Sequence, residues 1–333
     1  MKELVETNEG SLAPKKHSLM RLLEVRELVL IVLILLGGFA MSLVSPIFLN
    51  PANLLAILLG VSIDGIIAAG MTVLLVSGGF DLSVGSTLAL SGIVTCLCIK
   101  AGFPVPLAVS TGILSGALVG LVNGLIVTKW RIHPFIVTLG MLSIVRGFVL
   151  ILAKGVTIVE LPKSFTILGQ GKVFGVQFPI IITIIVIILG DILLRKTRFF
   201  RQSYYIGGNE KAAIMTGIKV NKVKIISYVI VGALSAMAGV LIASRLGAAS
   251  VNIGVGEELK VITACVIGGA SLNGGEGSVV GAFLGTLLMA ILLNSLNLLG
   301  IDVYWQNVAT GVILIAAVVL DTDLKRRRED AAQ

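Results

Sequence analysis

The sequence predicts an all-α polytopic membrane protein with about ten transmembrane helices. Of the 333 residues, 56% are hydrophobic and only 13% are charged, and the mean hydropathy is +1.04. Ordinary soluble proteins carry about 25% charged residues. A water-soluble fold would therefore have too few polar side chains to cover this much apolar surface, whereas lipid covers apolar side chains directly.

The apolar blocks have the length that membrane crossing requires, which is about 20 residues for a helix. The segment at 258–270 is too short to cross alone, so we expect a half-helix or re-entrant piece there, and eight or nine spans remain alternatives. The first block exceeds a signal-peptide core of about 7–15 residues and is expected to stay as an uncleaved span. The predicted spans lie near 28–47, 52–76, 84–100, 104–128, 134–153, 177–194, 225–246, 258–270, 278–297 and 303–320.

Lysine and arginine predict the orientation, because cytoplasmic loops collect them. Tails at 1–27 and 321–333 are both basic, so we expect both termini in the cytoplasm, on either side of a transmembrane domain over 28–320. The loop at 195–224 carries eight Lys and Arg residues and is expected on the same side. The segment Lys154–Val176 then falls outside, although its three lysines run against the rule.

Several function classes are disfavoured by what the sequence lacks. The G-x-x-x-x-G-K-[ST] phosphate loop does not occur, so we expect no ATP to bind by that route. No Cys/His cluster suggests a metal, and Cys96, Cys98 and Cys265 lie inside apolar runs as expected for core residues. His133 lacks a local partner for acid–base chemistry, so we expect no enzyme activity. The basic residues lie at the edges of apolar blocks without a nucleic-acid-binding signature, which argues against that partner.

Glycines recur at a spacing of four, which places them on one helical face and lets two helix backbones approach closely. We predict helix packing by Gly112, Gly116, Gly120, Gly124, Gly277, Gly281 and Gly285.

Carboxylates inside apolar blocks are functional candidates, because burying a charge in a membrane is costly. Asp64 lies within the second block, Asp302 begins the last span, and Asp81 lies in the segment "SGGFDLSVGS". Proton- or sodium-coupled carriers use such residues, so an ion-coupled secondary transporter is the alternative function. For Asp81, together with Ser83, we favour capping of the helix that starts near Val84.

The polar stretch "YYIGGNEKAAIMTGIKVNKVKI" at 204–225 separates two apolar blocks. Asn209 is a good N-cap, Glu210 suits a first helical turn, and Gly217 can end the helix. A two-turn helix in a basic loop has little to stabilise it unless it docks on another surface.

Four motifs together carry a family resemblance: "GGNEKAAIMTGIKVNKVKI", "GGFDLSVGS", "GVGEELKVITACVIGGASLNGGEGSVVGAFLG" and "NSLNLLGIDVYWQ". In their order along the chain, the motifs resemble permease subunits of ribose-type ABC importers, which are binding-protein-dependent sugar transporters. Two residues depart from the pattern: Thr216 stands where serine is frequent, and Lys260 where an acidic residue is common.

The resemblance implies a type II importer bundle in the bacterial inner membrane, paired with a second permease copy of the same or a different chain. A separate ATPase would use ATP and magnesium, and an extracytoplasmic binding protein would deliver a monosaccharide, or a related polyol or nucleoside, and contact the outer loops. The implied ATPase-coupling residues are Gly207, Gly208, Asn209, Glu210, Ala212, Ala213, Gly217 and Ile218. Candidates for the pathway or for helix caps are Asp81, Ser83, Glu258, Ser271 and Asn273, and Asn123, Asn294 and Asn297 are further pathway candidates.

Overall fold

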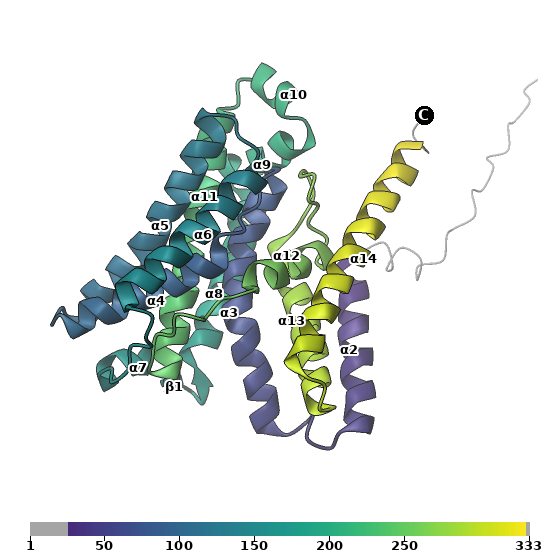
Figure 1. Cartoon of the computed structure of the whole chain (residues 1–333). Coiled ribbons are helices and arrows are strands. Elements are labelled where there is room, and N and C mark those ends of the chain that lie inside the picture. Colours follow the sequence, from purple (N-terminus) through teal and green to yellow (C-terminus); the bar gives the residue numbers. More distant parts are fainter. Residues whose placement is uncertain (1–25, 331–333) are drawn as a thin grey trace, which may run out of the picture.

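The computed structural model describes residues 26–330, and in this range the chain forms a bundle of helices (Figure 1). Eight of these helices are long and apolar enough to cross a membrane. They are α2 (Arg26–Val44), α3 (Pro51–Val76), α5 (Val105–Lys129), α6 (Pro134–Ala153), α8 (Phe178–Lys196), α11 (Val220–Leu246), α13 (Val279–Leu298) and α14 (Val303–Asp330).

Two shorter helices occupy the remaining predicted spans, α4 (Val84–Lys100) and α12 (Glu257–Ile267). The expected half-helix is α12, which has 11 residues and follows a non-helical segment at 247–256. Non-helical backbone at membrane depth must find hydrogen-bond partners inside the protein. Arg146 of α6 supplies them here, because one guanidinium nitrogen donates to the carbonyls of Val251 (2.8 Å) and Ile253 (2.9 Å).

Short elements lie at the two ends of the bundle (Figure 1). Helix α7 (Lys163–Gln170) and a hairpin of β1 (Lys172–Val173) and β2 (Val176–Gln177) lie at one end. Helices α9 (Arg198–Gly208) and α10 (Glu210–Met215) lie at the other end, where α14 also terminates. We call this second end the α10 end.

Three boundaries differ from the sequence predictions. Most of the loop predicted at 195–224 is helical, because α9 precedes the expected α10 and α11 begins already at Val220. At the other end of the chain, α14 continues to Asp330, ten residues past the predicted span. The predicted N-terminal tail lies outside the described residues up to residue 25, and Glu27 belongs to α2.

Close backbone contacts hold the centre of the bundle together. A Cβ atom added to Gly116, Gly120 or Gly124 of α5 would overlap atoms of α11. Gly281 and Gly285 of α13 face the backbone of α12 in the same way, whereas Gly277 lies before α13 and has a φ of +147°. Helix α3 lies in the interior, with almost every residue from Val61 to Val76 buried.

Candidate functional site

The short helix expected after Asn209 is present as α10, and its caps are the expected ones. The Asn209 side chain accepts a hydrogen bond from the Ala212 N–H at 3.0 Å. Gly217 ends the helix with a φ of +82°, and the Ile218 N–H donates to the Ala213 carbonyl at 3.1 Å. Local hydrogen bonds therefore define both ends of α10.

Helix α10 has an inner and an outer face. Ala213 is buried in a small cluster with Ile206, Val220 and Val223, so it anchors α10 to α9 and α11. Glu210 supports this contact through an ion pair with Lys224 at 2.7 Å. The outer face carries Ile214, which is 58% exposed, and Met215, which is 90% exposed.

Sequence reasoning did not select Ile214 and Met215, because the motif was read without knowing which face of α10 points outward. The available sequence signal is that Ile214 and Met215 are two adjacent apolar residues at the end of a six-residue helix in a polar loop. Of the two central alanines, Ala212 is exposed and Ala213 is buried.

Helix α9 ends in a backbone contact that joins three of the sequence motifs. Gly207 lies against Val76 and the Gly274–Gly275 backbone, and Gly274 also lies against Gly78. The Gly275 N–H donates to the Val76 carbonyl at 3.0 Å. We call Gly78, Gly207, Gly274 and Gly275 the glycine junction. A Cβ at Gly207 would overlap both the Val76 carbonyl oxygen and the Gly275 nitrogen, so only glycine fits there without displacement.

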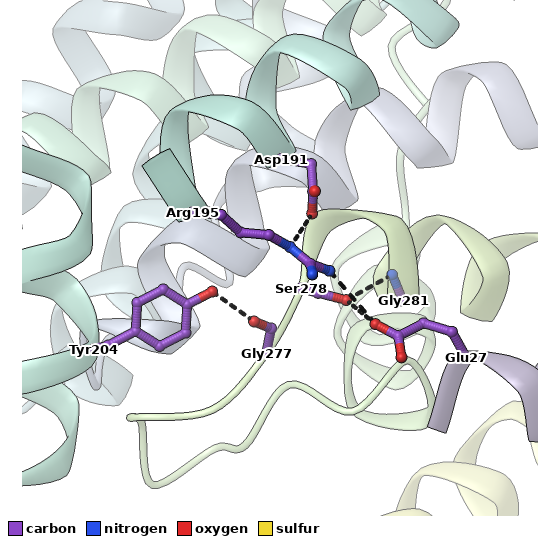
Figure 2. Close-up of polar contacts among 7 residues, drawn as sticks. All are labelled: Glu27, Asp191, Arg195, Tyr204, Gly277, Ser278 and Gly281. Atoms are coloured by element: carbon purple, nitrogen blue, oxygen red, sulfur yellow. Dashed lines mark hydrogen bonds and ion pairs between the residues drawn. The ribbon is translucent and has the colours of Figure 1, made fainter. Parts of the chain in front are cut away.

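A second contact connects α9 to the start of α13 (Figure 2). The Tyr204 hydroxyl donates to the Gly277 carbonyl at 2.8 Å. The next residue, Ser278, caps α13 by accepting from the Gly281 N–H at 2.9 Å.

The same serine connects α13 to α2 and α8 (Figure 2). The Ser278 hydroxyl donates to Glu27 at 2.9 Å, and Glu27 lies 3.5 Å from an Arg195 nitrogen. Arg195 also pairs with Asp191 at 3.0 Å. Helix α9, just before α10, is thus connected through Tyr204 and this network to α13, α2 and α8.

Asp81 accepts from a backbone N–H at the start of α4, as the capping prediction requires, and it also belongs to a buried polar cluster. Its carboxylate accepts from the Ser83 N–H (2.7 Å) and hydroxyl (2.6 Å), and from the Asn123 amide (3.1 Å). Ser83 is the N-cap residue of α4 but makes no capping bond with its side chain. The predicted contact to a backbone N–H at the helix start is therefore present, and the contact to Asn123 on α5 was not predicted.

The other candidates of the pathway-or-cap set lie apart. The Ser271 hydroxyl donates to Asp321 at 3.1 Å, close to the α10 end, and Asn273 is exposed in the same loop. Glu258 lies in the first turn of α12 beside Gly85. Asn294 exchanges hydrogen bonds with Asn53. These side chains do not gather in one site.

Two unusual residues are paired with one another. The Lys260 ammonium lies 2.6 Å from a carboxylate oxygen of Asp64, which is 5% exposed, and 3.6 Å from Glu257. The lysine that departs from the ribose-type pattern therefore neutralises the carboxylate inside the second span.

Comparison with known proteins identifies the family of the chain. Residues 53–318 match the family model described as "Branched-chain amino acid transport system / permease component". The chain belongs to this permease family. Three similar relatives are the ribose import permease RbsC of Bacillus subtilis, the L-arabinose ABC transporter permease AraH of Azospirillum brasilense and the ribose import permease RbsC of Escherichia coli K12.

The similarity to these permeases extends over most of the chain. The Bacillus protein is 42% identical over 84% of this chain and 88% of its own length. The Azospirillum protein is 39% identical over 90% and 88%, and the Escherichia protein 39% over 84% and 88%. No solved structure matches the chain. The protein is therefore a multi-pass membrane permease of the class found in ABC sugar importers, as the motifs predicted.

Proposed function

We propose that this chain forms the translocation pathway for a monosaccharide, in a complex with a separate ATPase and an extracytoplasmic binding protein. The family description mentions branched-chain amino acids, but the relatives at 39–42% identity are named for ribose and L-arabinose. A pentose or a related neutral solute is thus the supported class. A second permease copy completes the membrane unit.

The exposed end of α10 carries this proposal, because it offers an ATPase a docking surface joined to the bundle. Ile214 and Met215 project from a short helix whose other face is fixed by Ala213. An exposed apolar pair on a helix outside the membrane-spanning segments is a candidate contact site for a partner protein. The glycine junction lies directly before α10, so movement of α10 would be passed to α3 and to the loop before α13.

The α10 end then faces the cytoplasm, together with the end of α14. This orientation agrees with the eight basic residues at 195–224. The hairpin at the opposite end faces outward, where the fully exposed Phe174 and three lysines are available to a binding protein.

Changing one exposed residue at each end tests the assignment. The expected result is that Met215→Glu weakens capture of the cognate ATPase by the purified permease at least about tenfold, because it places a charge in an apolar contact. The matched variant, Phe174→Glu, should leave ATPase capture intact and weaken binding-protein-stimulated uptake. Equal ATPase capture by Met215→Glu and the unchanged protein would refute the docking role of α10.

The ion-coupled alternative is less well supported, because its two candidate carboxylates already have partners. Asp64 is paired with Lys260, and Asp81 accepts from Ser83 and Asn123. We expect liposomes containing the permease alone to show no uptake of D-ribose, L-arabinose or leucine under an imposed proton or sodium gradient. Gradient-driven uptake by the chain alone would establish the alternative.

A further inference from the structure

A cavity of about 180 Å³ lies between α3, α4, α11 and α12, in the interior of the bundle. One water molecule needs about 10–15 Å³ of cavity volume measured in this way, so the cavity has room for a small organic solute. Its walls come from the middle of α3, the last turn of α11 and the first turn of α12. The wall residues used below are Gly60, Asp64, Arg245, Gly254, Glu257 and Lys260.

Four charged side chains line this cavity, two acidic and two basic. Charged residues inside membrane-spanning segments are rare and generally mark a substrate or ion route. Asp64 and Lys260 are in direct contact at 2.6 Å. One carboxylate oxygen of Glu257 is buried without a hydrogen bond of ordinary length within the described residues, faces Lys260 at 3.6 Å and lies beside Asp64.

Neutralisation of Asp64 alone does not account for this arrangement. One lysine is sufficient to balance one buried carboxylate, and a pair of apolar side chains would cost less still. Glu257 and Arg245 add a second acid and a second base around the same space. The break before α12 brings Glu257 and Lys260 to the cavity, since Gly254 and the first turn of α12 both line it.

We propose that this cavity is a contact site for the transported solute, and that its charged side chains favour a neutral polyhydroxylated compound. The carboxylates accept and the cationic groups donate, so both roles of a hydroxyl group are served. The four formal charges cancel, and a solute with a net charge would enter without a counter-charge for its burial. This inference rests on the proposed function and adds the residues that distinguish solutes.

Paired neutral substitutions separate solute contact from structural support. In Asp64→Asn/Lys260→Gln one acid and one base are removed together, so the formal charge of the cavity is unchanged and the complex should assemble. In proteoliposomes with the ATPase and binding protein, initial uptake of D-ribose or L-arabinose should fall about tenfold, as expected for the loss of one charge-assisted hydrogen bond. The control is Thr183→Val, which removes a buried hydrogen bond from α8 to the Ser62 carbonyl of α3 and does not line the cavity. It should retain uptake.

The outcomes distinguish the two proposals. Unchanged uptake by an assembled Asp64→Asn/Lys260→Gln complex overturns the solute site and leaves the permease assignment standing. Absence of ATP-dependent sugar uptake by the unchanged protein overturns both.

A second experiment tests the cavity without using any solute. Gly60 lines the cavity with open space at its Cβ position, so Gly60→Cys is accommodated. Gly140 of the apolar helix α6 has equally open space but is exposed on the surface of the bundle and does not line the cavity. An ionic thiol reagent should label Gly60→Cys faster than Gly140→Cys, above the background of the three native cysteines. Equal labelling rates would refute a water-accessible cavity.

Discussion

At the residue scale, the pairing of Asp64 with Lys260 predicts how the free energy of unfolding responds when one partner is removed. A buried ion pair contributes little net stability, but removing one partner leaves an uncompensated charge that costs about 3–5 kcal/mol. The short separation of 2.6 Å and the burial of Asp64 place this pair in that category.

The single variant Lys260→Met should therefore lower the free energy of unfolding by about 3–5 kcal/mol, because Asp64 is left without its closest counter-charge. Adding Asp64→Asn should recover most of this loss. Thermal unfolding of the purified protein in detergent measures both variants. If the single and double variants are equally stable, Lys260 is not the group that stabilises the buried Asp64 carboxylate.

Position 207 requires glycine because the surrounding backbone leaves no room for a side chain. The change Gly207→Ala should destabilise the protein by about 1–3 kcal/mol, as overpacking does, because the added methyl group overlaps the backbone of two other segments. The neighbouring change Gly208→Ala has no atom within 4 Å of the added group and serves as the matched control. Equal unfolding temperatures of the two variants would contradict the close contact at the glycine junction.

At the scale of elements, α10 is a six-residue helix that depends on its caps. The change Asn209→Ala should cost about 1 kcal/mol, because the Ala212 N–H loses its acceptor. Hydrogen exchange at residues 212–215 should become faster, and ATPase capture weaker. Asn209→Asp preserves an acceptor and should behave like the unchanged protein, so a loss of capture there as well would separate capping from docking.

The elements also show which features a sequence reveals. Helix α10 was predictable because its caps are local: Asn209 and Gly217 act within three or four residues. The brevity of α12 was likewise visible as a short apolar run. By contrast, the second partner of Asp81 was not predicted, because Asn123 lies 42 residues away. The direction in which Ala213 faces depends on contacts with α9 and α11, which no local pattern specifies.

At the scale of the whole molecule, the α10 end and the hairpin end should face opposite sides of the membrane. Met215→Cys should react with an impermeant thiol reagent only in inverted vesicles, and Phe174→Cys only in right-side-out cells. Both side chains are among the most exposed in the bundle, so burial does not limit the reaction. Labelling of both positions from the same side would contradict the orientation.

The sequence also predicted the fold class of the whole bundle, because a membrane-spanning helix must be apolar and about 20 residues long. It did not predict that Gly78, Gly207 and Gly274 would meet, although each lies in a motif that had been recognised. That meeting depends on the packing of α3, α9 and the loop before α13, which are distant along the chain.

Helix α12 has a mechanical consequence for how energy reaches the cargo. At 1.5 Å per residue, its 11 residues form a rod about 16 Å long. The first turn of α12 carries Glu257 and Lys260, which line the charged cavity. A few residues after its last turn, the chain reaches Gly274 and Gly275 of the glycine junction, which lies directly before α10. If an ATPase binds α10 as proposed, a displacement of the glycine junction would have a path of one short helix to Lys260 and its contact with Asp64.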